Sequence, residues 1–216
     1  MTRPLLLGHR GARAVKSILE NTLASFDRCL ADGCDGFEFD VRLTADRQPV
    51  ICHDAEFAGI EIAKARAQQL TSLPTLKDVL AQYKSRAFLD IELKVAGLEG
   101  VATVLLRTYP PERGFVVSSF LPEVLQALHV KDATIPLGLI CETKAQLRGW
   151  KNLPIEYVIP HHKLVTPGVI REIKDAGKKI LVWTVNAPAD MRRFTEAGVD
   201  GIISDDTSLL CLTLHP

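Results

Sequence analysis

The sequence lacks an excess of charge of either sign, because 26 lysine and arginine residues balance 26 aspartate and glutamate residues. A protein without net charge is not drawn as a whole toward nucleic acid or toward anionic lipid. We therefore expect no nucleic-acid partner. An anionic substrate would have to be recognised by a local group of side chains.

Long apolar runs and paired cysteines are missing as well. No apolar stretch approaches the ~20 residues that span a bilayer, so we expect no integral membrane contact. The five cysteines are odd in number, scattered and without C-x-x-C spacing, which favours reduced, mostly buried thiols over a zinc or redox site. The only apolar run near the start comes too early for a cleavable signal peptide. The sequence thus predicts a cytoplasmic protein.

Short apolar runs alternate with segments of helical periodicity along the chain, which is the pattern of βα units around a parallel sheet. A length of 216 residues without linker or repeat fits one α/β domain. We therefore predict a single domain over residues 1–216, a compact (β/α)8 TIM barrel. A seven-unit or irregular barrel is the alternative. The eight expected strands cover residues 4–8, 36–43, 87–94, 115–120, 135–141, 157–160, 179–185 and 201–204.

Four helices carry clear boundary signals, at residues 21–31, 75–83, 167–176 and 188–197. The last two each have proline in the first turn and glycine just after the end, which are typical helix start and stop residues. Residues 55–72 carry no clear signal, although 61–69 are compatible with a short helix.

Several of the expected strands end in polar residues. Side chains at the carboxyl ends of barrel strands converge on one rim, so these residues are candidates for a common site. They are His9, Arg10, Glu38, Asp40, His53, Glu92 and Lys94.

Three of these residues are acids. Glu38 and Asp40 are two apart on a strand, so both carboxylates point to the same side and repel each other unless a cation joins them. Glu92 adds a third oxygen ligand from another strand. An all-carboxylate set favours one divalent cation of the hard type, Mg²⁺ or Ca²⁺. Ion pairs with Arg42 or Lys94 are the alternative role for these acids.

Two histidines close strand runs beside these acids. His9 and His53 could supply one general base and one general acid at neutral pH. Taken singly, each could equally be a hydrogen-bonded structural residue. Arg10 and Lys94 could offset phosphate charge, or serve as counter-ions to the carboxylates, and the two roles are compatible.

The ordered motifs together resemble the glycerophosphodiester phosphodiesterase family. They are His9-Arg10-Gly11, Glu20-Asn21-Thr22, Glu38-x-Asp40, His53-Asp54, Glu92-x-Lys94, Ser118-Ser119-Phe120, Val182-Trp183-Thr184-Val185-Asn186 and the segment 198–205. Each motif alone is weak, but six or more in order with barrel spacing are highly specific.

The resemblance implies an enzyme of glycerol and lipid metabolism that hydrolyses glycerophosphodiesters to glycerol 3-phosphate and an alcohol. It implies a cation held by Glu38, Asp40 and Glu92 and catalysis by His9 and His53. It also implies phosphate contacts from Arg10 and Lys94, with Glu20 and Trp183 as further substrate-site residues. From the residues alone, Glu20 could as well be part of a helix start. Trp183 could be a buried aromatic at a strand end.

One departure from the family concerns the segment after His53-Asp54. The family carries a sizeable insertion there that covers the alcohol of the substrate, whereas only residues 54–73 separate His53 from Pro74. We expect a shortened insertion after the second strand and a more open pocket that tolerates varied head groups. A lyase that stops at a cyclic phosphate and a non-catalytic barrel that binds metal are the rival hypotheses. We expect a monomer or small homo-oligomer.

Overall fold

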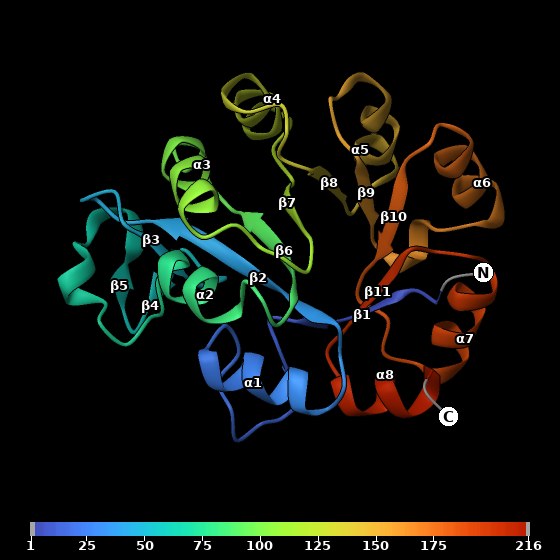
Figure 1. Ribbon diagram of the computed structural model, residues 1–216, viewed down its shortest axis with the longest axis horizontal. Coiled ribbons are helices and arrows are strands. Elements are labelled where there is room, and N and C mark those ends of the chain that lie inside the picture. Colours follow the sequence, from blue (N-terminus) through green and yellow to red (C-terminus); the bar gives the residue numbers. More distant parts are fainter. Residues whose placement is uncertain (1–2, 215–216) are drawn as a thin grey trace.

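The computed structural model describes residues 3–214, and a closed barrel of parallel strands forms its centre (Figure 1). Each barrel strand pairs in parallel with its neighbours, and β1 pairs with both β2 and β11, which closes the ring. The predicted (β/α)8 TIM barrel is therefore confirmed. Its strands are β1 (Leu5–His9), β2 (Gly36–Leu43), β6 (Phe88–Leu93), β7 (Phe115–Ser119), β8 (Leu137–Cys141), β9 (Tyr157–Pro160), β10 (Lys179–Val182) and β11 (Gly201–Ser204).

Helices surround the barrel as an outer layer (Figure 1). They are α1 (Leu23–Ala31), α2 (Leu76–Tyr83), α3 (Glu99–Thr108), α4 (Pro122–Lys131), α5 (Lys144–Arg148), α6 (Pro167–Asp175), α7 (Pro188–Glu196) and α8 (Thr207–Leu214), with 3-10 turns η3 (Gly149–Asn152) and η4 (His162–Leu164). Among residues 3–214, no helix has the length and apolar character needed to cross a membrane.

The expected strands agree with the observed ones to within about three residues. The run at 179–185 ends early, at Val182, because Trp183 forms only an isolated bridge with His161. The expected helix at 61–69 is replaced by two 3-10 turns, η1 (Ile62–Lys64) and η2 (Ala67–Gln69). Backbone hydrogen bonds at Ala65 and Leu70 end these turns before a full helix develops.

The segment between β2 and α2 projects to one side of the ring (Figure 1). Here β3 (Pro49–Ile51) runs antiparallel to β2, and β4 (Glu56–Phe57) pairs with β5 (Ile60–Glu61). A small apolar cluster that includes Val50, Ile62 and Leu70 holds the segment together. This is the short insertion after the second barrel strand, and it carries His53 at its base.

Apolar and acidic side chains alternate along β2, so the apolar ones face the helices and the acidic ones face the inside of the barrel. The ring of Phe37 stacks on that of Phe26 with centroids 4.2 Å apart and meets the edge of Tyr83 at 5.0 Å. These rings lie in the layer between strands and helices, so Glu38 and Asp40 point into the barrel. Aromatic packing on one face thereby fixes the carboxylates on the other.

The five cysteines are all buried and free, in agreement with the prediction of reduced thiols. The sulfur atoms of Cys34 and Cys211 lie 3.6 Å apart, which is a contact between thiols and not a disulfide bond.

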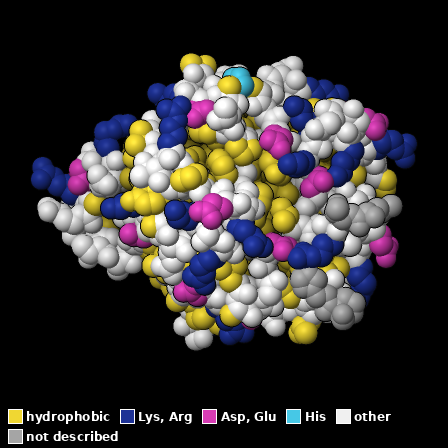
Figure 2. All heavy atoms as spheres, viewed as in Figure 1, with side chains coloured by type: hydrophobic (Ala, Val, Ile, Leu, Met, Phe, Trp, Pro, Cys, Tyr) yellow, Lys and Arg dark blue, Asp and Glu magenta, His cyan; other side chains and the backbone are white. Residues whose placement is uncertain are grey.

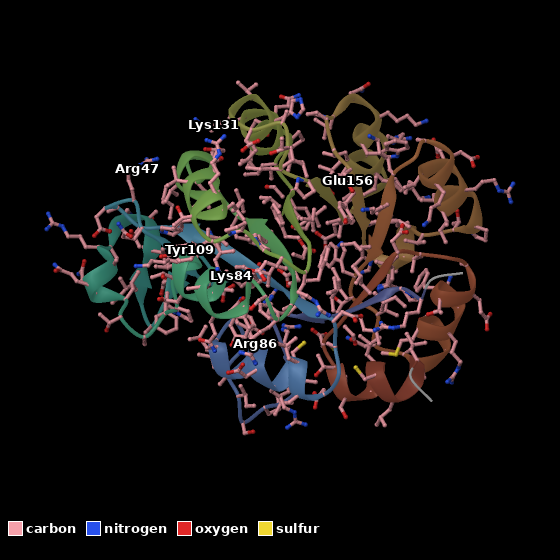
Figure 3. All side chains as sticks on the ribbon, in the orientation of Figure 1. Arg47, Lys84, Arg86, Tyr109, Lys131 and Glu156 are labelled. Atoms are coloured by element: carbon pink, nitrogen blue, oxygen red, sulfur yellow. The ribbon has the colours of Figure 1, made fainter. Side chains whose placement is uncertain are left out.

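Charged side chains of both signs are interspersed over the face of the molecule shown in Figure 2, around a more apolar centre. Lys84, Arg86 and Glu156, labelled in Figure 3, come just before β6 and β9. They therefore belong to the amino-terminal rim of the barrel. The predicted site residues belong to the opposite rim, where the strands end.

Replacing Phe37 with alanine should destabilise the protein by ~3–5 kcal/mol, because it removes a fully buried ring and leaves a cavity. Urea unfolding followed by circular dichroism measures this loss. Val130→Ala, at a side chain that is 86% exposed, should stay within about 0.5 kcal/mol of the parent protein. Equal unfolding midpoints for both variants would contradict the packing described above.

Candidate active site

The carboxyl ends of the barrel strands surround a cavity of about 330 Å³. Seven of the nine predicted site residues line it, and the other two, Asp40 and Glu20, lie behind its wall in contact with residues that do. The two histidines, separated by more than forty residues of sequence, face the same cavity. Its lining residues are His9, Arg10, Glu38, His53, Asp90, Glu92, Lys94, Phe120, Ile140, Glu142, Ile159, Trp183 and Ile203.

The predicted metal ligands come together in this site. One carboxylate oxygen from each of Glu38, Asp40 and Glu92 lies within 4.8 Å of the others, and all three residues are buried. Glu38 also has a buried oxygen that accepts no hydrogen bond from the described residues, whereas the corresponding oxygens of Asp40 and Glu92 face the ammonium of Lys94. A buried oxygen without a donor is costly, so this cluster calls for a positive partner.

The side chains of Lys94 and Arg10 supply part of that positive charge. The ammonium of Lys94 lies 2.8 Å from Glu92 and 3.2 Å from Asp40, and the guanidinium of Arg10 lies 3.2 Å from Asp40. The expected alternative of ion pairing is therefore realised for Lys94. Arg42 instead donates to the carbonyl oxygen of His53.

A fourth buried acid, Asp90, belongs to the same cluster, and our sequence interpretation missed it. It precedes Glu92 by two residues on β6, so both side chains point into the barrel. One of its oxygens accepts a hydrogen bond from Ser118 at 2.6 Å, and the other has no donor within the described chain. The spacing Asp90-x-Glu92 repeats that of Glu38-x-Asp40, and this repetition was the available signal.

Burial and mutual repulsion shift the pKa values of these acids. Burial, followed by the negative charges of Asp40, Glu92 and Asp90, raises the pKa of Glu38 well above its usual value. Burial and Asp40 likewise raise the pKa of Glu92 to about 7, against the effect of Lys94. For Asp90, burial raises the pKa to about 7 although Ser118 opposes it.

Asp40 differs from its neighbours. Burial alone would raise its pKa, but Lys94, Arg10 and a hydrogen bond from Asn21 outweigh burial and lower it. Four buried acids thus face two cationic side chains in contact with them. The oxygen-only donor set, the buried oxygens of Glu38 and Asp90 that have no donor among the described residues, and the remaining negative charge fit a hard divalent cation.

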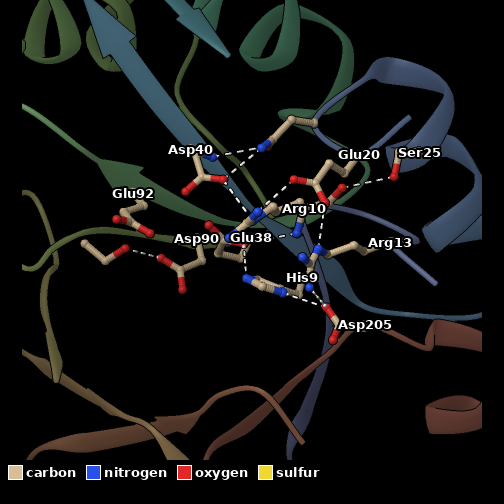
Figure 4. A network of polar contacts seen from close by, with 12 residues as sticks. His9, Arg10, Arg13, Glu20, Ser25, Glu38, Asp40, Asp90, Glu92 and Asp205 are labelled. Carbon is tan, nitrogen blue, oxygen red and sulfur yellow. Dashed lines mark hydrogen bonds and ion pairs between the residues drawn. The ribbon is translucent and has the colours of Figure 1, made fainter. Parts of the chain in front are cut away.

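His9 is held by an acid that lies on the last barrel strand. Its Nδ1 lies 2.7 Å from Oδ1 of Asp205, directly after β11, and Figure 4 shows the ring between Asp205 and Glu38. Although burial opposes it, hydrogen bonds from His9, Asn186 and Arg13 keep the pKa of Asp205 far below its usual value. An ionised carboxylate only accepts, so Nδ1 carries a hydrogen and donates it to Asp205, which leaves Nε2 on the side of Glu38.

His53 is held in a similar way but in a wetter place. Its Nδ1 lies 2.7 Å from Asp54, whose side chain is 78% exposed, whereas the side chain of Asp205 is 21% exposed. Burial lowers the pKa of His53, although Asp40 and Asp54 act in the opposite direction. The two imidazoles therefore differ in how firmly a carboxylate fixes them.

Glu20 lies beside Arg10 and Arg13, outside the cluster of metal-ligand candidates. Its two oxygens accept hydrogen bonds from these arginines at 2.7 and 2.6 Å, as Figure 4 shows. Burial opposes ionisation of Glu20, but the two arginines outweigh burial and lower its pKa. Glu20 is not the cap of α1, a position held by Thr22, and is instead a partner of Arg10 and Arg13.

The backbone at Arg10 brings these groups together. Its φ of 55° lies in the left-handed region, and its amide donates to Glu38 at 3.0 Å. Its carbonyl oxygen accepts from the amide of Asn21 and the hydroxyl of Ser25. Hydrogen bonds from the amide of Arg10 to β2 and to its carbonyl from Asn21 and Ser25 thus fix the loop after β1.

Trp183 forms part of the cavity wall. Its indole nitrogen donates to the carbonyl oxygen of Ile159 at 2.9 Å, and its ring meets Phe120 and His161 edge-on at 5.8 and 5.2 Å. These contacts fix the plane of the indole ring.

A TIM barrel whose carboxyl-terminal rim holds two histidines, each beside a carboxylate, and a cluster of buried acids beside Arg10 and Lys94 is typical of an enzyme that uses general acid–base catalysis. The family follows from comparison with known proteins. A sequence profile of the glycerophosphoryl diester phosphodiesterase family matches residues 9–209, and the chain belongs to this family.

Individual relatives cover nearly the whole chain. A glycerophosphodiester phosphodiesterase from Caldanaerobacter subterraneus is 28% identical over 96% of this chain and 96% of its own. Their alignment spans 239 positions, more than the 216 residues here, so the relative carries segments that this chain lacks.

Solved structures share the fold. A glycerophosphodiester phosphodiesterase from Parabacteroides distasonis superposes with a TM-score of 0.88 at 23% identity, covering 99% of this chain and 97% of that one. An Oleispira antarctica phosphodiesterase, solved in complex with the product sn-glycerol-3-phosphate, gives 0.87 at 24% identity, covering 99% and 98%.

Replacing Asp205 with asparagine should cost about 1.5–3 kcal/mol of stability at neutral pH, since it removes a partly buried charge that accepts several hydrogen bonds. The native pKa of Asp205 is lowered, so its contribution is present above about pH 4 and is lost as the pH falls below that value. Urea unfolding from pH 7 down to pH 3 measures the difference between variant and parent.

Asp54→Asn is the matched control, because Asp54 lies at the same 2.7 Å from a histidine but in water. Its stability should change by less than about 0.5 kcal/mol. A difference for Asp205→Asn that grows as the pH falls would contradict the assignment of an ionised carboxylate.

Proposed function

We propose that this protein hydrolyses glycerophosphodiesters to glycerol 3-phosphate and an alcohol, as a single domain, with one divalent cation, Mg²⁺ or Ca²⁺. The observation that carries the proposal is the meeting of His9, His53 and the acidic cluster around one cavity. Family membership supports the substrate class.

Glu38, Asp40 and Glu92 would hold the cation, with Asp90 beside them. A cation bound there would supply Lewis-acid chemistry, stabilising negative charge that develops on the phosphate oxygens. The guanidinium of Arg10 and the ammonium of Lys94 face the cavity from the same side. They would bind the phosphate oxygens and offset their remaining charge.

His9 acts as the general base. Asp205 holds the Nδ1 hydrogen and stabilises the imidazolium that forms when Nε2 takes a proton from the attacking oxygen. The attacker is water or the 2-hydroxyl of the substrate's own glycerol, in which case water opens the cyclic phosphate. The new P–O bond forms as the bond to the alcohol oxygen breaks, and His53 acts as the general acid that donates a proton to that oxygen.

Glu20 acts as a positioning residue that holds the fork of Arg10 toward the phosphate. Trp183 contributes an aromatic wall for the substrate. We also propose that the protein works in the cytoplasm, which its five buried, free thiols support. A monomer or small homo-oligomer without a nucleic-acid partner stays our prediction.

Removing divalent metal with EDTA should abolish formation of glycerol 3-phosphate from glycerophosphocholine, and Mg²⁺ or Ca²⁺ should restore it. The same cation should also raise the melting temperature. At a concentration 100 times its Kd, it should increase the free energy of unfolding by about 2.7 kcal/mol. Glu38→Gln should lose both effects. Glu196→Gln, at an exposed acid at the far end of α7, should keep both. If neither Mg²⁺ nor Ca²⁺ changed the melting temperature, the proposed metal site would be refuted.

His9→Ala and His53→Ala should each lower kcat on glycerophosphocholine by about 10²–10⁴-fold with unchanged circular dichroism. A p-nitrophenyl ester of glycerol phosphate distinguishes their roles, because nitrophenolate leaves without a proton. On that ester His53→Ala should recover most of its activity, whereas His9→Ala should not. His129→Ala, on the outer helix α4, is the control. Recovery by His9→Ala instead would reverse the acid and base assignments.

A further inference from the structure

The cavity wall divides into two arcs of different chemistry. Strands β1, β2 and β6 are neighbours in the barrel and, together with the β3 segment, carry all of the catalytic and phosphate-binding candidates. The opposite arc, from β7 to β11, contributes mainly apolar side chains to the wall. These are Phe120, Ile140, Ile159, Trp183 and Ile203.

Glu142 is the one charged lining residue on the apolar arc within the described chain. It follows β8 directly, and its carboxylate has no hydrogen bond or ion pair to any residue in the range 3–214. The other lining acids, Glu38, Asp90 and Glu92, lie on the opposite arc beside Arg10 and Lys94. Glu142 is thus a carboxylate on the apolar side of the cavity that forms no side-chain hydrogen bond or ion pair with the described residues.

The backbone that carries Glu142 is firmly held. The side-chain oxygen of Gln146 accepts from the amides of Glu142 and Thr143 at 3.0 and 2.9 Å, and the hydroxyl of Thr143 caps α5 in return. A residue on a fixed loop keeps its charge at a fixed place on the rim.

The rings of Phe120 and Trp183 line the same arc of the cavity as Glu142. Trp183 is fixed by its bond to Ile159 and by edge contacts with Phe120 and His161. The imidazole of His161 accepts from the amide of Lys163 through Nδ1, and burial followed by His162 and Lys163 lowers its pKa. The charge of Glu142 acts on that pKa in the opposite direction, which places the carboxylate near this ring.

The ammonium of Lys94 already lies 5.8 Å from the centre of the Phe120 ring, so Trp183 is the aromatic wall left for a second cation. From this arrangement we infer that Glu142 and Trp183 select substrates whose alcohol is a cationic amine, such as choline or ethanolamine. The inference rests on the proposed function, since it places the phosphate on the charged arc. A substituted ammonium group combines positive charge with apolar surface, and aromatic faces with one carboxylate match both properties. An uncharged polyol such as glycerol or inositol would find few hydrogen-bond partners on this arc.

This inference makes the expectation of an open pocket for varied head groups more specific. It would admit varied head groups, as its shortened cover predicts, but would favour the cationic ones. The experiment measures kcat/KM by release of glycerol 3-phosphate from four substrates: glycerophosphocholine, glycerophosphoethanolamine, glycerophosphoglycerol and glycerophosphoinositol. The parent enzyme should favour the first two.

Glu142→Gln should lower the ratio of cationic to neutral kcat/KM by about 5-fold, the effect of one solvent-accessible charge pair, and Glu142→Lys should lower it further. Glu196→Gln, which removes the same charge far from the cavity, should leave the ratio unchanged. Glu142 is exposed, so both variants should fold, and circular dichroism checks this.

Equal loss on all four substrates would place Glu142 against the common glycerol moiety and overturn the inference, as would an unchanged ratio in Glu142→Lys. Both results would leave the proposed function standing. Absence of glycerol 3-phosphate from every substrate in the parent enzyme, with metal supplied, would instead refute the proposed function.

Discussion

Mutual repulsion of buried acids is the constraint on which the rest of this structure depends. Glu38, Asp40, Asp90 and Glu92 lie inside a barrel where their charges are poorly solvated, and among residues 3–214 Arg10 and Lys94 are the arginine and lysine side chains that pair with them. Burial, and after it the negative charge of neighbouring acids, raises the pKa values of Glu38, Asp90 and Glu92. Repelling acids that are poorly solvated favour a positively charged partner, and this is why the proposed cation and phosphate are placed beside them.

Rigid apolar packing makes that repulsion tolerable. The rings of Phe26, Phe37 and Tyr83 lock β2 from outside, so Glu38 and Asp40 cannot turn away from one another. Asp205 fixes His9 from the far end of the chain, across the seam where β11 closes on β1. Closure of the barrel therefore has a chemical consequence, because it supplies the carboxylate that selects the tautomer of His9.

The same closure produces a cavity with two unlike sides. Polar groups gather on three neighbouring strands, and the remaining strands contribute apolar walls with a single carboxylate. This division separates the region that would handle the phosphate from the region that would meet the alcohol. None of residues 54–73 lines the cavity, so under the proposed function the choice of alcohol would depend on the wall itself.

The sequence by itself determined the eight strands, because alternation and βα periodicity are local signals, and it determined which residues close them. It could also have shown Asp90, whose two-residue spacing from Glu92 matches that of Glu38 and Asp40. Only the tertiary structure decided that Asp205 holds His9, that Glu20 pairs with Arg10, and that Glu142 lies opposite the acids without a side-chain partner among residues 3–214. These pairings join residues far apart in the chain or on different loops, and their geometry exists only once the barrel has closed and burial has set the strength of each charge.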